Sequence, residues 1–239
     1  VIAARELDLD GLDNRNWVND HTVYTHGYGV VAAYGNKVTA DGQPKFFEAG
    51  IPTSKLTDSE KYEPRIYFSP NATEYSIVGA SEGTKSWEFD YPTGSEGATN
   101  TFKGDGGPKI GNIFSRLLYA IRFGSDQILF SNRVNSNSQI LYDRSPKERV
   151  AKVAPYLTLD GRVYPAWWTD GQVDRGRLHH FGRYPYSQMT DLGEATKDST
   201  TESSDTVSSL NSKNANYIDN SVKATVDAYD GSVDLYVWD

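Results

Sequence analysis

The sequence contains no cysteine and one methionine among its 239 residues. Without cysteine the chain can form neither a disulfide, nor a thiolate nucleophile, nor a cysteine-ligated zinc site. A chain of this length buries a sizeable core without disulfides, so the absence does not identify the cellular compartment. No run of apolar residues approaches the eighteen or so that a transmembrane helix needs, and we predict no membrane-spanning segment within the sequence.

The sequence also lacks an initiator methionine, since it begins at Val1, and it has no basic-then-apolar signal segment. We expect it to be an excised part of a longer protein. Its 24 basic and 32 acidic residues give a net charge of −8. This balance argues against a nucleic-acid partner, which requires a concentrated basic face. It also argues against docking on anionic lipid through a polybasic surface.

The first hundred residues are rich in short runs of β-branched and aromatic residues, which predict strands. Turn pairs such as Asp10-Gly11 and Asp41-Gly42 separate these runs. The predicted strands cover 1–7, 22–33, 65–68, 75–78 and 87–91.

The second half of the chain is richer in helix signals. Apolar residues at helical spacing predict a helix over 110–123, with Pro108 near its start and Gly124 just after its end. A second helix is predicted from Ser145, which can cap its N-terminus, and ends before Pro155.

A third helix is predicted over 217–229, where four large apolar residues share one helical face, and a last strand over 232–238. The segments 157–159 and 163–168 flank Asp160-Gly161 and predict a hairpin. The polar stretch 196–216 is predicted to be a mobile loop.

These elements predict an α+β fold rather than a regular α/β repeat, because the strands cluster before residue 110 and alternate with helices only after it. We expect a mixed or mainly antiparallel sheet, a β-rich first half, and about three helices packed on the sheet in the second half. The whole chain, 1–239, is predicted to form a single domain.

Several short stretches, taken together and in this order, resemble one known family. They are 3–7 (AAREL), 16–19 (NWVN), 24–29 (YTHGYG), 62–68 (YEPRIYF), 104–107 (GDGG), 140–144 (ILYDR), 184–187 (YPYS) and 220–229 (NSVKATVDAY). The series resembles the uncharacterised protein family 0182, which consists of large integral membrane proteins found mainly in actinobacteria.

The resemblance implies a cellular location for the chain but no chemical reaction. It implies the architecture of that family, in which a bundle of N-terminal transmembrane helices is followed by a large domain outside the cytoplasmic membrane. The chain is therefore expected to be part of an extracytoplasmic domain of a bacterial membrane protein, held at the membrane by helices that lie outside this sequence. The family has no established activity, so the resemblance implies no catalytic or binding residue.

One stretch, 167–183, departs from the family pattern. After Ala166 the resemblance leads us to expect an apolar strand and a segment like Asp-Gly-Tyr-Thr-Thr, whereas the chain carries His179-His180. Two ACC threonine codons read one base early become CAC-CAC, which encodes His-His. A local frameshift is therefore our hypothesis for 167–183, and an in-frame gene without compensating insertions and deletions relative to close relatives would refute it.

Two histidines near the N-terminus are candidates for a site. His21 and His26 are five residues apart, so a regular strand or helix would not bring them onto one ion. His26 and Tyr28, within a glycine-bearing segment, remain candidate ligand-binding residues if a distant side chain joins them. The alternative is a hydrogen-bonded structural histidine in a turn.

Two loops have the residue types of ion sites. Asp8, Asp10 and Asp13 suggest a calcium loop, but Leu12 occupies a ligand position of the EF-hand pattern and the distal glutamate is absent. We therefore predict turn or helix-cap roles for these aspartates and no cofactor; the alternative is a calcium site outside the EF-hand pattern, formed by Asp8 or Asp10 with distant carboxylates. Asp105 lies in a glycine-rich stretch before a predicted helix, where an anion or other ligand could bind, although its charge would repel phosphate.

No recognisable catalytic motif is present: there is no Gly-x-Ser-x-Gly elbow and no cysteine. We therefore expect a non-enzymatic extracytoplasmic domain that binds an envelope glycan, lipid or protein, or that scaffolds a complex. The alternative is an envelope hydrolase that acts on glycan or lipid through paired carboxylates. A metal-stabilised structural domain is a third hypothesis.

Overall fold

The computed structural model describes residues 1–51, 63–79, 85–94, 96–157, 159, 163–168, 177–181 and 222–237. The predicted α+β class is confirmed: strands dominate the first half of the chain, and the α-helices lie within residues 113–153. Every strand pair in the described ranges is antiparallel.

The elements follow the chain in this order. The first half contains β1 (Ile2–Ala4), the short 3₁₀-helix η1 (Leu9–Gly11), the π-helical turn η2 (Asn19–Val23), β2 (Gly27–Tyr28), β3 (Val30–Val38), β4 (Pro44–Glu48), β5 (Arg65–Ile66), β6 (Ser76–Val78), β7 (Glu88–Thr93) and β8 (Glu96–Asn100). The second half contains α1 (Ile113–Phe123), α2 (Gln127–Phe130), β9 (Gln139–Leu141), α3 (Pro146–Val153), β10 (Tyr164–Trp168), β11 (Arg177–Phe181), β12 (Val222–Asp227) and β13 (Val233–Val237).

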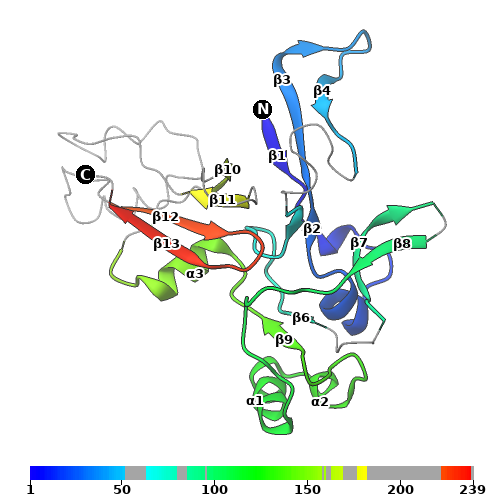
Figure 1. Cartoon of the computed structure of the whole chain (residues 1–239), viewed down its shortest axis with the longest axis vertical. Helices are drawn as coiled ribbons and strands as arrows, with labels where there is room; N and C mark the ends of the chain where they lie inside the picture. The colour runs from blue at the N-terminus through cyan, green and yellow to red at the C-terminus, as the bar shows by residue number, and fades with distance from the viewer. Residues whose placement is uncertain are drawn as a thin grey trace.

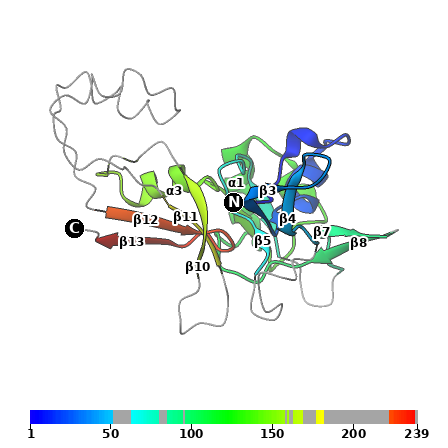
Figure 2. The same cartoon turned by 90° about the horizontal axis from the view of Figure 1, so that it is seen from above.

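Four groups of elements project from a common centre (Figure 1). They are the sheet β1-β3-β4, the hairpin β7-β8, the helices α1 and α2, and the sheet β10-β11-β12-β13. Seen from above, the last sheet and α3 lie on one side of the molecule, and β3, β4, β7 and β8 lie on the other (Figure 2). The short pairs β2-β5 and β6-β9 occupy the centre.

The β6-β9 pair has a hydrophobic cluster on each face. Ile77 pairs with Ile140, and both belong to a cluster with Ile110 and Ala120 of the α1 region. The neighbouring Val78 and Leu141 belong to a second cluster with Tyr67, Phe68, Phe102, Val150 and Val226. Because side chains of a strand alternate between faces, two adjacent residues in each strand are enough to join the two clusters.

Helix α1 confirms the helix predicted over 110–123, with a later start. Asn112 caps its N-terminus by accepting a hydrogen bond from the Ser115 amide at 2.8 Å, and Gly124 ends it in the left-handed region at φ 63°. Ile110 precedes the helix and is fully buried, and its amide hydrogen bonds to the Ser138 carbonyl.

Helix α3 confirms the second predicted helix, with Pro146 at its first position, although Ser145 makes no side-chain capping bond. It packs against the last sheet, where Val150 and Val226 share a cluster. The four-residue helix α2 was not predicted.

The helix predicted over 217–229 is wrong, because residues 222–227 form strand β12. β12 pairs with β11 on one side and with β13 on the other. Valine and threonine stiffen this segment and favour strand geometry, and pairing on both edges outweighs the helical spacing of its apolar residues. The strand predicted over 232–238 is confirmed as β13.

One other strand prediction needs correction. The segment 22–33 begins with the last residues of η2 and becomes extended only from Gly27. The hairpin predicted across Asp160-Gly161 stays a prediction, because residues 158 and 160–162 lie outside the described residues; the described partner of β10 is β11. The predicted loop 196–216 lies outside the described residues, and of the stretch 167–183 only the strand residues are described, so the frameshift hypothesis stays a prediction.

Candidate functional site

His26 lies at the centre of the molecule, directly before β2. Its Nε2 is 2.9 Å from Oδ1 of Asp90 in β7, and its Nδ1 is 2.9 Å from the hydroxyl of Thr25. An ionised carboxylate only accepts hydrogen bonds, so Nε2–H donates to Asp90. The His26 ring also packs 4.5 Å from the ring of Tyr67. The distant partner that a site at His26 requires is therefore Asp90.

Asp90 is shared between His26 and Arg65 of β5. The Nε and NH2 groups of Arg65 donate to the two oxygens of Asp90 at 2.9 and 2.8 Å, a bidentate ion pair. Burial opposes the ionisation of Asp90, but the hydrogen bonds from His26 and Arg65 outweigh it, and its pKa lies below the usual value. Tyr28 is half-buried nearby, and burial, reinforced by the charge of Asp90, raises its pKa to about 12.

Glu88 lies two residues before Asp90 in β7, so both carboxyl groups point to the same buried face. It accepts hydrogen bonds from the Tyr67 hydroxyl at 2.6 Å and from the backbone amides of Gly79 and Phe102 at 2.9 and 3.0 Å. Burial raises the pKa of Glu88 despite these donors. Burial, together with Glu88, raises the pKa of Tyr67.

Arg144 lies between β9 and α3 and is almost completely buried. Its guanidinium donates to the carbonyls of Tyr67, Glu74 and Thr25 and to the hydroxyl of Ser76. Burial lowers its pKa to about 10, so the side chain remains charged at neutral pH. Carbonyl oxygens from three segments thus surround one cation and join these segments.

We call His26, Arg65, Tyr67, Glu88, Asp90 and Arg144 the buried polar centre. Thr25, His26 and Asp90 form a chain of hydrogen bonds that looks like a hydrolytic triad, but Thr25 is fully buried and His26 is 4% exposed. A nucleophile must reach its substrate, and this hydroxyl does not. Each charged group is instead satisfied by a protein partner, which is the pattern of structural buried polar groups.

A cavity of about 390 Å³ lies between α3, the glycine turn at 106–107 and the turn before β13. Asp143, at its edge, has a left-handed φ of 50° and forms an ion pair with Lys152. Arg149 donates to the carbonyls of Gly231, Tyr142 and Gly106 and stacks on Phe68. Both cations of the lining already have partners, and Asp143 is its one carboxyl group.

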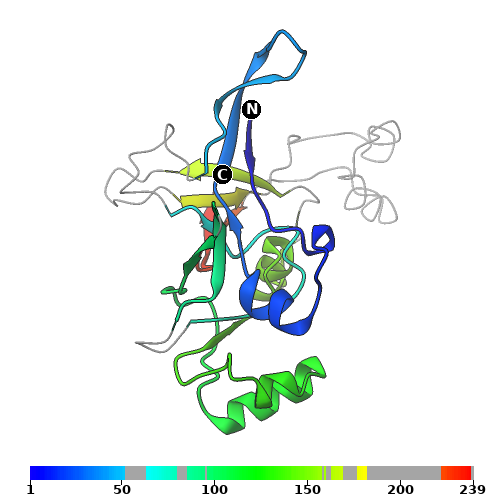
Figure 3. The same ribbon diagram turned by 90° about the vertical axis from the view of Figure 1, so that its right-hand side faces the viewer.

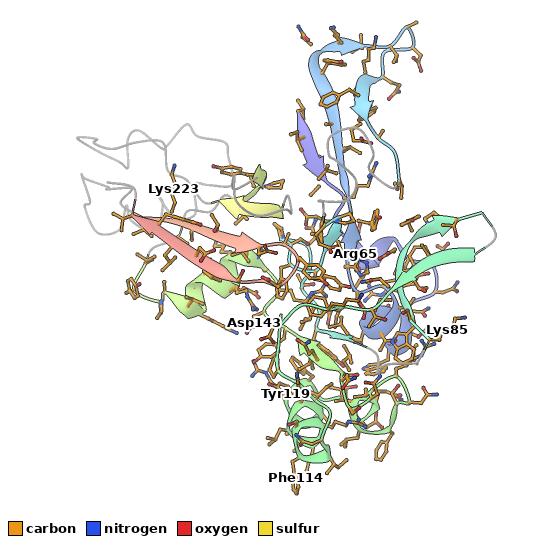
Figure 4. All side chains as sticks on the ribbon, in the orientation of Figure 1. Arg65, Lys85, Phe114, Tyr119, Asp143 and Lys223 are labelled. Carbon is orange, nitrogen blue, oxygen red and sulfur yellow. The ribbon has the colours of Figure 1, made fainter. Side chains whose placement is uncertain are left out.

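Helix α1 is apolar on two sides, one facing the core and one facing solvent. Its side chains Tyr119, Ala120 and Phe123 pack into the cluster around Ile110. Its opposite side consists of five large apolar residues that are 45–77% exposed, and we call them the outward face of α1: Ile113, Phe114, Leu117, Leu118 and Ile121. In Figure 4 the labelled Phe114 points away from the molecule, and Tyr119 lies on the side of α1 that meets it. The sequence predicted the apolar spacing of this helix, and the structure shows that its larger apolar side faces solvent.

The structure brings His26 and Tyr28 together beside Asp90, and it places Asp105 elsewhere. Asp105 is exposed in the glycine turn, next to the cavity but outside its lining. This turn is not the N-terminus of α1. A Cβ at Gly107 would lie 2.1 Å from the Ile140 carbonyl, so the glycines permit close packing against β9.

The three aspartates of the predicted calcium loop have local roles. Asp8 caps η1 by accepting from the Asp10 amide, and Asp10 forms an ion pair with Arg15 at 2.7 Å. Asp13 is exposed. Within the ranges that the structure describes, no group of three or more histidine or acidic residues is placed to hold a metal. Calcium binding at these residues stays a prediction.

Sequence reasoning did not identify Arg65, Glu88, Asp90 or Arg144. A signal for two of them was present, since Glu88 and Asp90 alternate with Phe89 and Tyr91 in a predicted strand. The structure buries the acidic residues of this strand and leaves the aromatic ones half-buried. His26 and Asp90 are 64 residues apart, and only the fold brings them together.

The comparisons with known proteins agree on one family. The model of the uncharacterised protein family UPF0182 matches residues 1–239. The chain is 90% identical to a UPF0182 protein of Bifidobacterium adolescentis, 81% to one of Bifidobacterium longum and 55% to one of an Arthrobacter species, in each case over 100% of its length. It spans 22–24% of these three relatives.

No solved structure matches the chain. Within the part of the chain that the structure describes, none of the helices is both long and apolar enough to cross a membrane.

Proposed function

The chain belongs to the uncharacterised protein family UPF0182, and from that premise we propose that it is a non-enzymatic extracytoplasmic domain of a bacterial membrane protein. Its role is to bind a component of the cell envelope through the outward face of α1. Because the chain spans about a quarter of its relatives, the proposal concerns this part alone.

The outward face of α1 is the observation that carries the proposal. Phe114 is 77% exposed and Leu118 is 68% exposed, and their helix is fixed to the molecule by Tyr119 and Phe123 on its other side. Scattered apolar residues on a surface need no explanation, but a contiguous apolar patch marks an interaction site. Covering such a patch removes its apolar surface from water, which is favourable in proportion to the area.

The buried polar centre supports a binding role rather than a catalytic one. The carboxyl groups of Glu88 and Asp90 are buried, and each is occupied by protein donors. A glycosidase needs two carboxyl groups facing each other across a space that admits substrate. The cavity beside α3 offers only Asp143, so the geometry supports the envelope hydrolase less well than the binding domain.

Two single cysteines test the proposal in the full-length protein in intact cells, since the chain itself lacks cysteine. The variants are Leu118→Cys, on the outward face, and Asp105→Cys, at an exposed turn, each in a protein without other cysteines. We expect a membrane-impermeant maleimide to label Asp105→Cys in intact cells and to label Leu118→Cys much more slowly. Both should react at the same rate after denaturation.

The location of the domain and the binding through the outward face can each be contradicted by a separate result. Labelling of Asp105→Cys only after the cells are opened would place the domain on the cytoplasmic side. Labelling of Leu118→Cys as fast as Asp105→Cys would show that nothing covers the outward face.

A further inference from the structure

The outward face of α1 is a continuous apolar arc. At about 100° per residue, Ile113, Leu117, Ile121, Phe114 and Leu118 cover roughly 140° of the helix circumference. Phe130 of α2, a helix that packs against α1, is also 80% exposed. The helix has 11 residues, about half of what a membrane span requires, so this arc suits an element that lies on a surface.

The chemistry of the arc argues against a folded protein as the partner. Its five side chains are aliphatic or phenyl groups and offer no hydrogen-bond donor or acceptor. Protein interfaces carry about one hydrogen bond per 100–200 Å² and are anchored by tryptophan, tyrosine and arginine, with leucine under-represented. Contact with the hydrocarbon of a lipid layer requires none of these groups.

The charge around the arc has the opposite sign to the charge of the whole chain. Residues 106–125 contain no aspartate or glutamate and three basic residues, Lys109, Arg116 and Arg122, whereas the chain carries −8. Lys109 and Arg122 are exposed, and Arg116 is half-buried. A surface that adjoins the arc would therefore meet positive side chains.

The position of α1 suits contact with a flat surface. The helices α1 and α2 form one extremity of the molecule in two perpendicular views (Figures 1 and 3). The sheets and the β7-β8 hairpin lie away from that end. A flat layer can thus reach the arc without meeting the rest of the molecule first.

We infer that the outward face of α1 docks on the surface of an anionic lipid bilayer, an inference that rests on the proposed function. The five apolar side chains enter the boundary between headgroups and acyl chains, as in interfacial amphipathic helices. Lys109 and Arg122 remain at the headgroups, where anionic phosphates attract them.

The negative charge of the whole chain does not oppose this docking. At physiological salt the Debye length is about 8 Å, so exposed charges farther away than this are largely screened. The two exposed charged residues within 106–125, Lys109 and Arg122, are both basic, and the nearest acidic residues along the chain are Asp105 and Asp126. The overall charge excludes a polybasic patch as the main source of affinity, which here comes from the apolar arc.

Vesicle binding of the 239-residue chain tests the inference. Vesicles of equal parts phosphatidylglycerol and phosphatidylcholine should bind the chain, and phosphatidylcholine alone should bind it more weakly. Phe114→Glu should lower the partition coefficient about tenfold or more, since it removes one apolar group and adds a charge. Lys109→Gln and Arg122→Gln should each lower it about fivefold on the anionic vesicles and leave binding to neutral vesicles unchanged.

Tyr156→Glu is the matched control, because Tyr156 is also an aromatic residue that is 77% exposed and it lies after α3. Its binding should equal that of the unsubstituted chain. Circular dichroism checks that each variant is folded, and Leu118→Gln, which keeps a good helix former, provides a second variant should Phe114→Glu unfold.

Three outcomes overturn the inference: no binding to the anionic vesicles, equal binding by Phe114→Glu or Leu118→Gln, or an equal loss in Tyr156→Glu. If vesicle binding fails while Leu118→Cys is protected in cells, only the lipid inference falls and the proposed function stands. If Leu118→Cys is fully reactive in cells, the proposed function falls as well.

Discussion

The buried polar centre and the outward face of α1 reverse the usual placement of side chains. Asp90, Glu88 and Arg144 are charged or titratable and buried, whereas Phe114 and Leu118 are apolar and exposed. The first group is satisfied by donors and acceptors from distant segments and so joins them. The second group is mostly exposed in the part of the chain that the structure describes. The comparison separates what stabilises the molecule from what it can offer to a partner.

The largest effect is expected from Arg144→Met. The substitution leaves the carbonyls of Tyr67, Glu74 and Thr25 without their donor. Each buried unpaired group is worth about 1–3 kcal/mol, so a loss of more than about 4 kcal/mol in the free energy of unfolding is expected. Urea unfolding measures it.

Arg122→Met is the control, since that guanidinium is exposed on α1, and it should change stability by less than about 0.5 kcal/mol. Similar losses in both variants would contradict a special role for the buried cation.

A smaller loss, of about 3 kcal/mol, is expected from Asp90→Asn, which leaves Arg65 and His26 without their carboxylate. The pKa of Asp90 is lower in the fold than its unfolded value of about 3.9. Its ionisation therefore stabilises the fold above that value, and this contribution is lost as the pH falls through the folded pKa. The difference between the two proteins should shrink below about pH 4.

Urea unfolding as a function of pH checks this, with Asp126→Asn at an exposed position as the control. A difference that stays constant from neutral pH to pH 3 or so would show that the charge of Asp90 contributes nothing.

The stability difference between Glu88→Gln and the unsubstituted protein should depend on pH in the opposite direction to that of Asp90→Asn. Because burial raises the pKa of Glu88, its contribution to stability is full below the unfolded value and is lost as the pH rises through the folded pKa. Glutamine keeps an oxygen for the amides of Gly79 and Phe102. As the pH rises from about 4 to 7, the free energy of unfolding of the variant should therefore increase relative to that of the unsubstituted protein. The increase should be about 1.4 kcal/mol for each unit by which the pKa of Glu88 is raised. Urea unfolding as a function of pH measures this change. An increase in the relative stability of the variant as the pH falls would contradict a raised pKa for Glu88.

The sequence predicted well where local chemistry decides. Gly124 ends α1 where the pattern placed its end, and α3 begins directly after Ser145, the predicted cap position. It failed over 217–229, where Val222 and Val226 fit both a helical face and an alternating strand. Pairing with β11 and β13 decides between them, and these are contacts that the local sequence does not specify.

The site was less predictable than the fold for the same reason. His26 was a candidate, but its partner Asp90 is 64 residues away, and Arg144 reaches Thr25 across 119 residues. The apolar spacing of α1 predicted a helix with one apolar face. Spacing does not say which side of a helix the rest of the chain covers, so the exposure of Phe114 and Leu118 emerged only from the structure.

The most direct test of the account is the stability of one variant that combines Phe114→Gln, Leu118→Gln and Ile121→Gln. Glutamine is a good helix former, so the substitutions remove the outward face and keep the helix. If this face lies outside the core, the free energy of unfolding in urea should change by less than about 1 kcal/mol. A loss of several kcal/mol, like the roughly 2–5 kcal/mol of a single large-to-small substitution in a core, would show that the domain itself buries this face and would contradict the account.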